Sequence, residues 1–438
     1  MKPAILLIRA GFDRGQGRNY RPWVLMEPLG LAILAALTPP AFRVQVADDR
    51  CERVPLDAAV DLVAISCCTF SVLRAYALAA AFRARGIPVV LGGFHPTLAP
   101  EEAARHADVV ATGDAEATWP LILEDFLRGT LKPRYGVPGA PPCLGVRPDR
   151  SVLGGRRYLP IQLVQFGRGC RNRCEFCAIG AFHGGAYVSR PVPEVLAEIR
   201  ESGRRRVFFV DDNLMTSRPA CVALLEALVP LNIRWSSQID IACADDPGLL
   251  ALMRRSGCQS LTIGIESLDP GNLQAMHKPL NRPERYAGQL ERLRRAGIMI
   301  YGSFLFGYAG DGPGSFAATA RFAGREGLFL ANFIPLMPLP GTPLYQRLHG
   351  EGRLIRPEWW LEPGFNWMQP LLEPAGMSSA ELAQGCLAAR RRFNGLGSLL
   401  RRLVKAPAHH RRLDNLVAFL AGNLLNRLDL AAKYRANT

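Results

Sequence analysis

The sequence predicts an α/β protein made of two successive parallel-sheet units and a helical C-terminal tail. Three observations carry this prediction. Short apolar runs alternate with helical patterns at the N-terminal end, a proline- and glycine-rich stretch without periodicity follows, and six further strand–helix repeats come after it. Strands that alternate with helices are typical of parallel sheets covered by helices. We assign residues 1–130 to the first unit, 131–158 to a linker, 159–345 to the second unit and 346–438 to the tail.

The first unit has the pattern of an open, doubly wound, Rossmann-like sheet. The expected strands are residues 4–8, 43–47, 61–66, 88–91 and 109–111, and the expected helices are 29–37 and 71–85. Such sheets bind ligands at the carboxyl ends of their strands. The loops expected there contain Ser66, the pair Gly92-Gly93, and Gly113. Paired glycines let the backbone approach a ligand closely, although such a pair is also an ordinary turn.

The second unit is more regular. Its expected strands are residues 161–166, 206–210, 234–239, 260–265, 299–306 and 332–337, and its expected helices are 193–202, 219–228, 247–256, 284–296 and 315–326. Six repeats in about 180 residues are too few for a closed eight-stranded barrel. The linker before them has no periodicity, and Cys143 within it has no evident role.

Composition indicates an ordinary globular protein of two or three domains, with 438 residues and 49% hydrophobic residues. No run approaches the ~18 apolar residues of a membrane span, and the N-terminus begins with a strand-like run. The 11 cysteines lack paired extracellular spacing, so we expect a reducing, cytoplasmic location. The formal charge of +15 suits nucleic acid, an anionic membrane or an acidic substrate, or only an arginine-rich surface.

Three thiols lie within eight residues, at Cys170, Cys174 and Cys177, in a loop otherwise filled by polar residues. A loop that offers three thiolates is suited to a metal. A structural zinc site requires a fourth ligand, and no histidine or further cysteine lies nearby at a spacing suited to that role. An iron–sulfur cluster is normally held by four thiolates, so three leave one iron open to an outside ligand. A zinc knuckle or chance clustering are the alternatives.

The spacing C-x3-C-x2-C, with Phe176 before the last cysteine, resembles the signature of the radical S-adenosylmethionine (radical SAM) superfamily. The resemblance implies a [4Fe-4S] cluster on Cys170, Cys174 and Cys177, with SAM on the open iron, and a 5′-deoxyadenosyl radical as the reactive product. It also implies a partial (β/α)6 barrel, which fits the six repeats.

The loops of the first unit resemble the cobalamin-binding domain found in front of many radical SAM enzymes. The residues concerned are Ser66, Gly92, Gly93, His95, Gly113 and Glu116, together with residues 28–31. Asp114 and Ala115 depart from the glutamate and glycine common in that family. The sequence lacks the D-x-H-x-x-G signature by which other proteins supply a histidine to cobalt. His95 is therefore either a cobalt ligand or a residue that shapes its loop, and the pair Cys67-Cys68 is either buried filling or a cobalamin contact.

Polar residues end the strands of the second unit and resemble the SAM-binding positions of the cobalamin-dependent branch. They are Asp211, Asp212, Gln238, Glu266 and Ser267. SAM needs a partner for its ammonium group and acceptors for its ribose hydroxyls, which carboxylates can supply. Phe176 is expected beside the adenine. Each of these acids has a helix N-cap as its alternative role.

The tail carries two further features. Trp359, Trp360, Phe365 and Trp367 are either a lid over the substrate or a contact that packs the tail onto the barrel. Residues 390–413 hold no acidic residue, and Val417, Leu420, Leu424 and Leu428 recur at helical spacing beside them. A basic amphipathic helix of this kind either lies on an anionic membrane or packs on its own domain.

The resemblance implies a cobalamin-dependent radical SAM enzyme, foremost a C-methyltransferase that acts on an unactivated carbon of a small-molecule or lipid-like substrate. A flavodoxin or ferredoxin type of electron donor is implied with it. A radical cyclase or rearrangement enzyme of the same family is the alternative. An RNA-modifying methylthiotransferase would carry a second cysteine triplet and an RNA-binding module, which the sequence lacks, so we expect no nucleic acid. A non-catalytic cobalamin-binding regulator would leave the cysteine loop unexplained.

Overall fold

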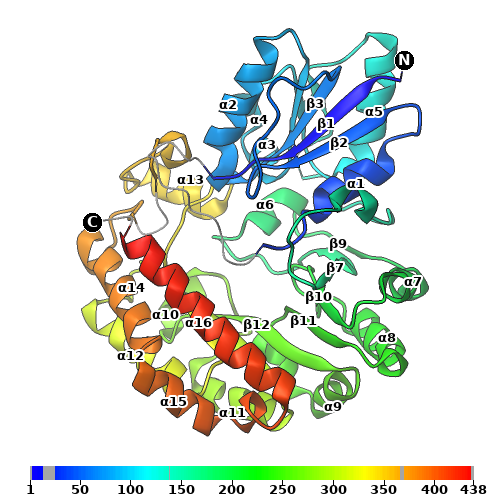
Figure 1. Cartoon of the computed structure of the whole chain (residues 1–438). Helices are drawn as coiled ribbons and strands as arrows, with labels where there is room; N and C mark the ends of the chain where they lie inside the picture. The colour runs from blue at the N-terminus through cyan, green and yellow to red at the C-terminus, as the bar shows by residue number, and fades with distance from the viewer. Residues whose placement is uncertain (1, 13–24, 138, 366–368, 436–438) are drawn as a thin grey trace.

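The computed structural model describes residues 2–12, 25–137, 139–365 and 369–435. Within these residues the strands form two six-stranded sheets and one two-stranded ribbon. The first sheet and its helices form the upper lobe in Figure 1, and the second sheet and its helices form the lower lobe. The α/β class expected from the sequence is confirmed.

The first sheet has the strand order β2-β1-β3-β4-β5-β6, and all its pairings are parallel. The strands are β1 (Ala4–Arg9), β2 (Arg43–Asp48), β3 (Leu62–Ser66), β4 (Val89–Gly92), β5 (Val109–Ala111) and β6 (Arg134–Tyr135). The helices are α1 (Leu29–Leu37), α2 (Val72–Arg83), α3 (Phe94–Leu98), α4 (Pro100–Ala103) and α5 (Ala115–Arg128), with the 3-10 turn η1 (Thr69–Ser71) before α2.

Apolar runs become buried strands here because both faces of the sheet are covered. Along β1, Leu6 and Ile8 pack into the core beneath α2, whereas Ile5 and Leu7 pack into the core beneath α1 and α5. Period-two alternation therefore distributes one apolar strand between two cores. The strand order reverses at β1, so the ligand site of such a sheet is expected at the carboxyl ends near β1 and β3.

The stretch expected as a linker contains structure. Its residues Arg134 and Tyr135 form β6, which pairs with β5 and extends the first sheet by one strand. The short helix η2 (Arg150–Leu153) follows. A strand of two residues is too short for any periodicity, which is why the sequence pattern did not indicate it.

The second sheet has the order β14-β13-β12-β11-β10-β7, again parallel throughout. Its strands are β7 (Gln162–Val164), β10 (Arg206–Phe209), β11 (Arg234–Gln238), β12 (Cys258–Glu266), β13 (Met299–Phe306) and β14 (Leu330–Pro335). The helices between them are α7 (Val192–Ser202), α8 (Arg218–Leu228), α9 (Pro247–Arg255), α10 (Pro270–Ala275), α11 (Pro283–Arg295) and α12 (Pro313–Arg325), with the 3-10 turns η3 (Val229–Leu231) and η4 (Ile241–Asp245). Since β7 and β14 do not pair with each other, the barrel is open, as expected.

An antiparallel ribbon separates the first barrel strand from its helix. It consists of β8 (Gly167–Gly169) and β9 (Tyr187–Ser189), and α6 (Ala178–His183) lies between them. The cysteine loop was expected to follow the first strand directly. It follows β8 instead, and the ribbon holds both ends of the loop.

The tail is helical, as expected, with α13 (Pro343–Gly350), η5 (Trp359–Leu361), α14 (Ser379–Phe393), α15 (Leu396–Lys405), η6 (Pro407–His409) and α16 (Leu413–Arg435). Trp359 and Trp360 are buried in the same core as β3 and α2. Trp359 also donates to the carbonyl of Pro338, just after β14, so the aromatic cluster packs between the first unit and the end of the barrel, while Trp367 lies outside the described residues. Among the residues described, no helix is both long enough and apolar enough to cross a membrane.

The apolar stripe of α16 does not pack on its own domain. Val417, Leu420, Leu424 and Leu428 are 52%, 47%, 58% and 40% exposed. Buried contacts of α16 come from the opposite side of the helix, at Asn415, Phe419 and Asn423. The stripe is therefore a surface feature.

Candidate functional site

The strand β8, Gly-Arg-Gly, delivers the chain to the cysteine loop. A side chain at Gly169 would place its Cβ only 2.1 Å from the carbonyl oxygen of Ala186 on the returning segment, and Gly169 also has a φ of +87°. Only glycine accepts both the close approach and the positive φ without strain. The close pairing with β9 fixes where Cys170 leaves the sheet.

Two consecutive carboxylates, Asp211 and Asp212, follow β10 and hold the backbone of β8 and of the residue before it. Asp211 accepts hydrogen bonds from the backbone N–H groups of Phe166 (2.9 Å) and Gly167 (2.6 Å). Asp212 accepts one from the N–H of Gly169 at 2.8 Å. Burial raises the pKa of Asp211 to about 7, although the two N–H groups act in the opposite direction. Asp211 and Asp212 therefore position the start of the cysteine loop.

The loop itself is tied to two other segments of the chain. Asn172 donates to Asp240 at 3.1 Å, and Asn213 donates to the same carboxylate at 2.6 Å. Glu175 forms an ion pair with Arg347 of α13 at 2.8 Å. These bonds fix the loop on both sides of Cys174, so its thiols are held by a built frame.

The three cysteines line one cavity of about 350 Å3 at the carboxyl ends of the barrel strands. Four of the residues expected to contact SAM line the same cavity: Phe176, Asp212, Gln238 and Glu266. Burial raises the pKa of Cys174 to about 12, against the lowering effect of nearby Lys278. Burial also raises the pKa of Cys170 and Cys177. Thiols that ionise reluctantly alone become favourable ligands once a cationic metal centre supplies the compensating charge.

This arrangement fits an iron–sulfur cluster with an open corner. No three His, Cys, Asp or Glu side chains in the described part of the chain converge as for a single metal ion. Cluster ligands need not converge in that way, because each thiolate binds a different iron. Three thiols around one cavity, with carboxylates among its other lining residues, match that requirement.

Lys278 is a site residue that the sequence pattern did not reveal. Its Nζ lies 3.1 Å from Glu266 Oε1 and donates to the carbonyl of Gly264 at 3.2 Å. Burial lowers the pKa of Lys278, but Glu266 and Cys174 outweigh it, and the net pKa is raised. Glu266 has a φ of +63°, an uncommon conformation for a residue with a side chain. The cavity therefore holds a fixed pair of opposite charges.

Other missed residues come from the inward faces of strands. Tyr301 and Ser303 on β13 and Asn332 on β14 line this cavity, and so do Asn213 and Asp240, which were expected among the polar residues at strand ends. Tyr301 and Ser303 stand two residues apart on β13, so polar side chains at alternating positions of a buried strand were the available signal.

Two of the residues expected to contact SAM lie outside this cavity. Asp211 is fully buried beneath β8. Ser267 is buried as well, and its Oγ accepts from the N–H of Asp269 at 3.1 Å. Both support the backbone of the site and neither lines its cavity.

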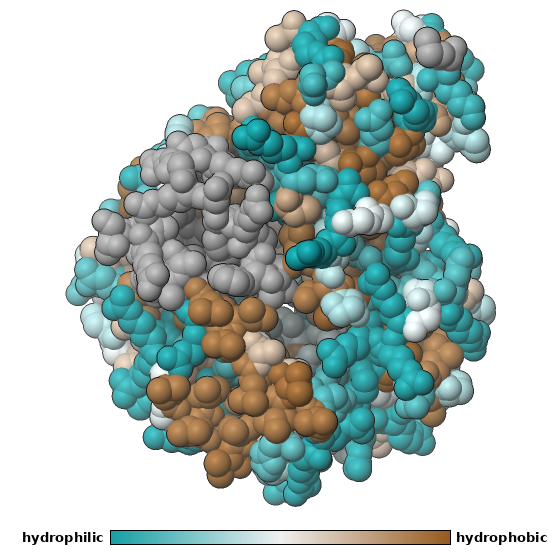
Figure 2. All heavy atoms as spheres, viewed as in Figure 1, coloured by the Kyte–Doolittle hydropathy of each residue, from teal (hydrophilic) through white to brown (hydrophobic). Residues whose placement is uncertain are grey.

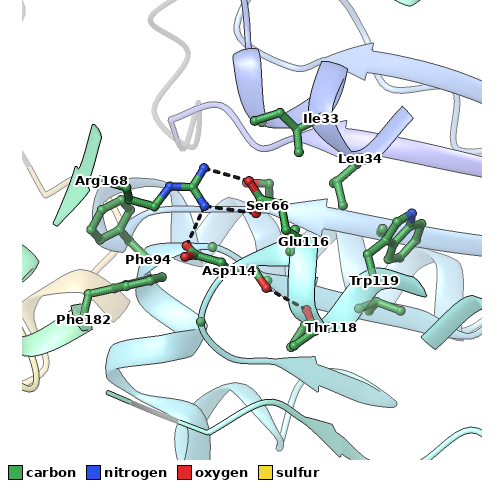
Figure 3. Close-up of a pocket in the computed structure, with 18 of the residues that line it drawn as sticks. Ile33, Leu34, Ser66, Phe94, Asp114, Glu116, Thr118, Trp119, Arg168 and Phe182 are labelled. Atoms are coloured by element: carbon green, nitrogen blue, oxygen red, sulfur yellow. Dashed lines mark hydrogen bonds and ion pairs between the residues drawn. The ribbon is translucent and has the colours of Figure 1, made fainter. Parts of the chain in front are cut away.

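A second cavity, of about 300 Å3, opens at the carboxyl ends of β3, β4 and β5. Five of the six residues expected to contact cobalamin line it: Ser66, Gly92, Gly93, Gly113 and Glu116. Ile33, Leu34 and Trp119 give it an apolar wall, and Figure 3 shows Phe94 and Phe182 together on another side. Volume and lining are those of a small-molecule or cofactor site.

Gly93 makes this cavity accessible to a flat ligand. Its φ is +100°, and a Cβ at this position would lie 2.7 Å from the carbonyl oxygen of Cys67. The backbone therefore turns at the cavity edge in a conformation that side chains rarely adopt. The apolar wall with bare backbone at its rim fits the corrin of cobalamin.

Arg168 joins the two units at the wall of this cavity. It lies 2.9 Å from Glu116 and 3.0 Å from Asp114, and both carboxylates come from the β5–α5 segment. Figure 3 shows the guanidinium directed at these two side chains. Burial opposes the charge of Arg168, but the two carboxylates outweigh it, and its pKa is raised. The departure at Asp114 from the family pattern thus supplies half of an inter-unit ion pair.

His95 is the sixth expected cobalamin contact, and the structure places it away from the cavity. Its side chain is completely buried, with Nε2 at 3.1 Å from Glu102 and Nδ1 at 3.3 Å from Thr69. Trp360 also donates to Glu102, at 2.8 Å. His95 therefore shapes its loop, which was one of the two roles expected for it. Cys67 is likewise buried in the core.

The two cavities have one lining residue in common, Asp212. It lines the cavity of the first unit together with Gln165 and Arg168, and it lines the barrel cavity together with the three cysteines. The carboxylate that anchors β8 thus lies where the two sites adjoin.

Comparison with known proteins finds two family models, one in each of the two units of the chain. The model of the radical SAM superfamily matches residues 164–323, and that of the B12 binding domain matches residues 24–123. Bacteriochlorophyllide d C-8(2)-methyltransferase of Chlorobaculum tepidum is 30% identical over 355 residues, which are 76% of this chain and 78% of the relative. Bacteriochlorophyllide d C-12(1)-methyltransferase of the same organism is 28% identical over 393 residues, 87% and 85% of the two chains.

A solved structure has the same fold. The radical S-adenosylmethionine methyltransferase TsrM of Kitasatospora setae, with cobalamin and a [4Fe-4S] cluster bound, superposes with a TM-score of 0.66 at 16% identity and covers 100% of this chain and 99% of that one. The motif, the two cavities and the relatives lead to one conclusion: the chain belongs to the cobalamin-dependent radical SAM methyltransferases.

Proposed function

We propose that this enzyme methylates an unactivated carbon of a hydrophobic small molecule, either lipid-like or a secondary metabolite, with a [4Fe-4S] cluster, SAM and cobalamin as its cofactors. The observation that carries the proposal is the shared lining residue Asp212. A radical site and a methyl-carrier site that adjoin across one residue allow a single substrate carbon to be served by both.

Three thiols, from Cys170, Cys174 and Cys177, are the ligands that we assign to the cluster. When bound, the cluster with SAM supplies a 5′-deoxyadenosyl radical, and cobalamin supplies the methyl carrier. Asp212 and Glu266 are the acceptors that we assign to the ammonium group and ribose hydroxyls of SAM. Lys278, held beside Glu266 at 3.1 Å, orients that carboxylate in a buried site.

The chain's own residues also separate the sites from water. Phe94 and Phe182, whose ring centroids are 4.8 Å apart, come from the two units and meet at the cavity of the first unit. Arg168 closes the same junction with its ion pairs. Exclusion of water protects a radical from side reactions.

The two relatives act, by name, on bacteriochlorophyllide d. Pigments of this type are therefore the first substrates to test, followed by polycyclic lipids. The proposal includes an external one-electron donor of the flavodoxin or ferredoxin type, as the resemblance to the radical SAM enzymes implies. It also includes a reducing, cytoplasmic compartment, in which the free cysteines stay reduced.

The test is anaerobic reconstitution of the full chain with iron, sulfide and hydroxocobalamin, followed by incubation with SAM, reductant and candidate substrates. Formation of 5′-deoxyadenosine and S-adenosylhomocysteine together, with a product heavier by one methyl group, supports the proposal. Deoxyadenosine without S-adenosylhomocysteine, together with an oxidised or rearranged product, would contradict methylation and favour a cyclase of the same family.

A further inference from the structure

In the C-terminal tail, eight large apolar side chains are exposed to solvent. On α15 they are Leu396, Leu400 and Val404, and on α16 they are Leu413, Val417, Leu420, Leu424 and Leu428, with exposed fractions between 40% and 78%. We call these eight residues the tail face. Figure 2 shows a broad hydrophobic patch at the lower left of the molecule, where Figure 1 places α15 and α16.

The spacing of the tail face is regular. On α15 the residues recur every four positions, and on α16 they recur every three or four. Each helix therefore presents one continuous apolar stripe. The opposite side of each helix packs against the rest of the protein, since Arg402 on α15 and Phe419 on α16 are fully buried. A contiguous exposed patch of this extent indicates an interaction surface.

A strongly basic pocket adjoins the tail face. It has a volume of about 500 Å3 and lies between α11 and the α15–α16 connection, at the amino-terminal ends of β11 and β12. Its lining holds seven cationic side chains and one acidic one, Glu291. The cations are Arg234, Arg254, Arg294, Arg295, Lys405, Arg411 and Arg412.

Part of this charge is not neutralised. Asp414 pairs with Arg234 at 3.2 Å and with Arg412 at 3.1 Å, and Glu291 pairs with Arg294 and Arg295. Among the described residues, Arg254, Lys405 and Arg411 have no carboxylate partner within ion-pair distance. Lys405 directly follows Val404, and Arg411 and Arg412 directly precede Leu413. Free positive charge therefore stands at the end of both apolar stripes.

We propose that the tail face docks on an anionic phospholipid bilayer, with the basic pocket receiving phosphate head groups. Apolar side chains that enter the head-group boundary and basic ones that meet lipid phosphates are the two components of interfacial helix binding. A second copy of this chain is a poorer partner. In a two-fold dimer both partners present the same surface, so a second copy would bring the same excess of positive charge to the contact. The proposal goes beyond the methylation reaction and is tested without it.

The experiment is flotation of the full-length protein with vesicles of phosphatidylcholine alone and with vesicles that contain about a third phosphatidylglycerol, the anionic component that basic segments recognise. We expect binding to the anionic vesicles, and weakening by salt because of screening. The double variant Leu400→Gln, Leu424→Gln should lower the bound fraction at least tenfold. The double variant Lys405→Gln, Arg411→Gln should remove the preference for anionic lipid.

Leu121→Gln with Leu127→Gln is the matched control. These two leucines of α5 are 53% and 57% exposed, belong to the first unit and should leave vesicle binding unchanged. Absence of wild-type binding to anionic vesicles, or equal losses in the tail and control variants, overturns the proposal. So does a wild-type dimer in sedimentation analysis that the Leu400→Gln, Leu424→Gln variant dissociates, because the face would then join two copies. None of these readouts involves methyl transfer, so failure here leaves the proposed function standing.

Discussion

The two cavities on either side of Asp212 are built from different parts of the polypeptide. The barrel cavity is defined by side chains: three thiols, three carboxylates and an ammonium group lie around one space. The cavity of the first unit is defined by backbone and shape, with glycines at its rim and apolar side chains on its wall. Reactive chemistry needs specific functional groups, whereas a large preformed cofactor needs room and a complementary surface. We therefore expect the two sites to respond to different substitutions.

The largest effect is expected from Cys174→Ala. Loss of one of three ligands should reduce the iron content from about four per chain to near zero and abolish the absorption near 400 nm, as expected for a cubane that lacks a ligand. Deoxyadenosine formation should fall to background, while cobalamin is still retained. Cys143→Ala is the control, because only the backbone of Cys143 contacts Asp114 and Arg168. Full iron content in Cys174→Ala would break the assignment of the barrel cavity.

Lys278→Met should weaken SAM binding without loss of iron. The change removes the hydrogen bonds that Lys278 donates to Glu266 and to the carbonyl of Gly264, so the carboxylate is no longer held in position for SAM; a loss of about 2 kcal/mol is about thirtyfold in affinity. Equilibrium binding of SAM to the reconstituted protein measures this. Lys132→Met is the control, since Lys132 is 69% exposed and pairs with Asp125 at 3.4 Å outside either cavity. Unchanged SAM affinity in Lys278→Met would show that the charge pair serves only the fold.

Asp211 should make stability depend on pH, because its pKa is raised to about 7 in the folded protein by burial. The native state then binds more protons than the unfolded state between about pH 4 and 7, so the free energy of unfolding falls as pH rises through that window. We expect a loss of about 2 kcal/mol from pH 5 to pH 8 from this group. Denaturant unfolding at several pH values measures it.

Asp211→Asn should abolish this pH dependence and leave the protein less stable than the wild type at pH 5, because one backbone N–H loses its acceptor. Asp108→Asn, at an exposed ion pair with Arg83, should keep the wild-type slope. A slope that persists in Asp211→Asn would assign the titration to another group.

The smallest effect is expected from Gly93→Ala. The added methyl group meets the carbonyl of Cys67 and strains a positive φ, at a cost of about 1–2 kcal/mol. Cobalamin affinity should fall about tenfold with iron content unchanged. Gly129→Ala shares the positive φ, at +69°, but meets nothing within 4 Å, so it should lose stability without losing cobalamin. Equal cobalamin affinities in the two variants would contradict the role assigned to Gly93.

The sequence alone determined the α/β class, the order of the two units and the open six-stranded barrel, because period-two strands and helical patterns are local properties. It also singled out Cys170, Cys174 and Cys177, since their spacing lies within one loop. The ends of strands were equally accessible, and together with the resemblance to the cobalamin-dependent family they predicted Gly92, Gly93, Glu116, Gln238 and Glu266, all of which line one of the two cavities.

Only the tertiary structure decided which of those residues face a cavity and which support the backbone. Asp211 and Asp212 are neighbours of identical type, yet one is buried beneath β8 and the other lines both sites. Lys278 and Arg168 acquire their roles through partners 12 and 52 residues away, and the exposed stripe of α16 depends on which side of that helix meets the barrel. Such pairings depend on how distant elements pack, and no local pattern in the chain encodes them.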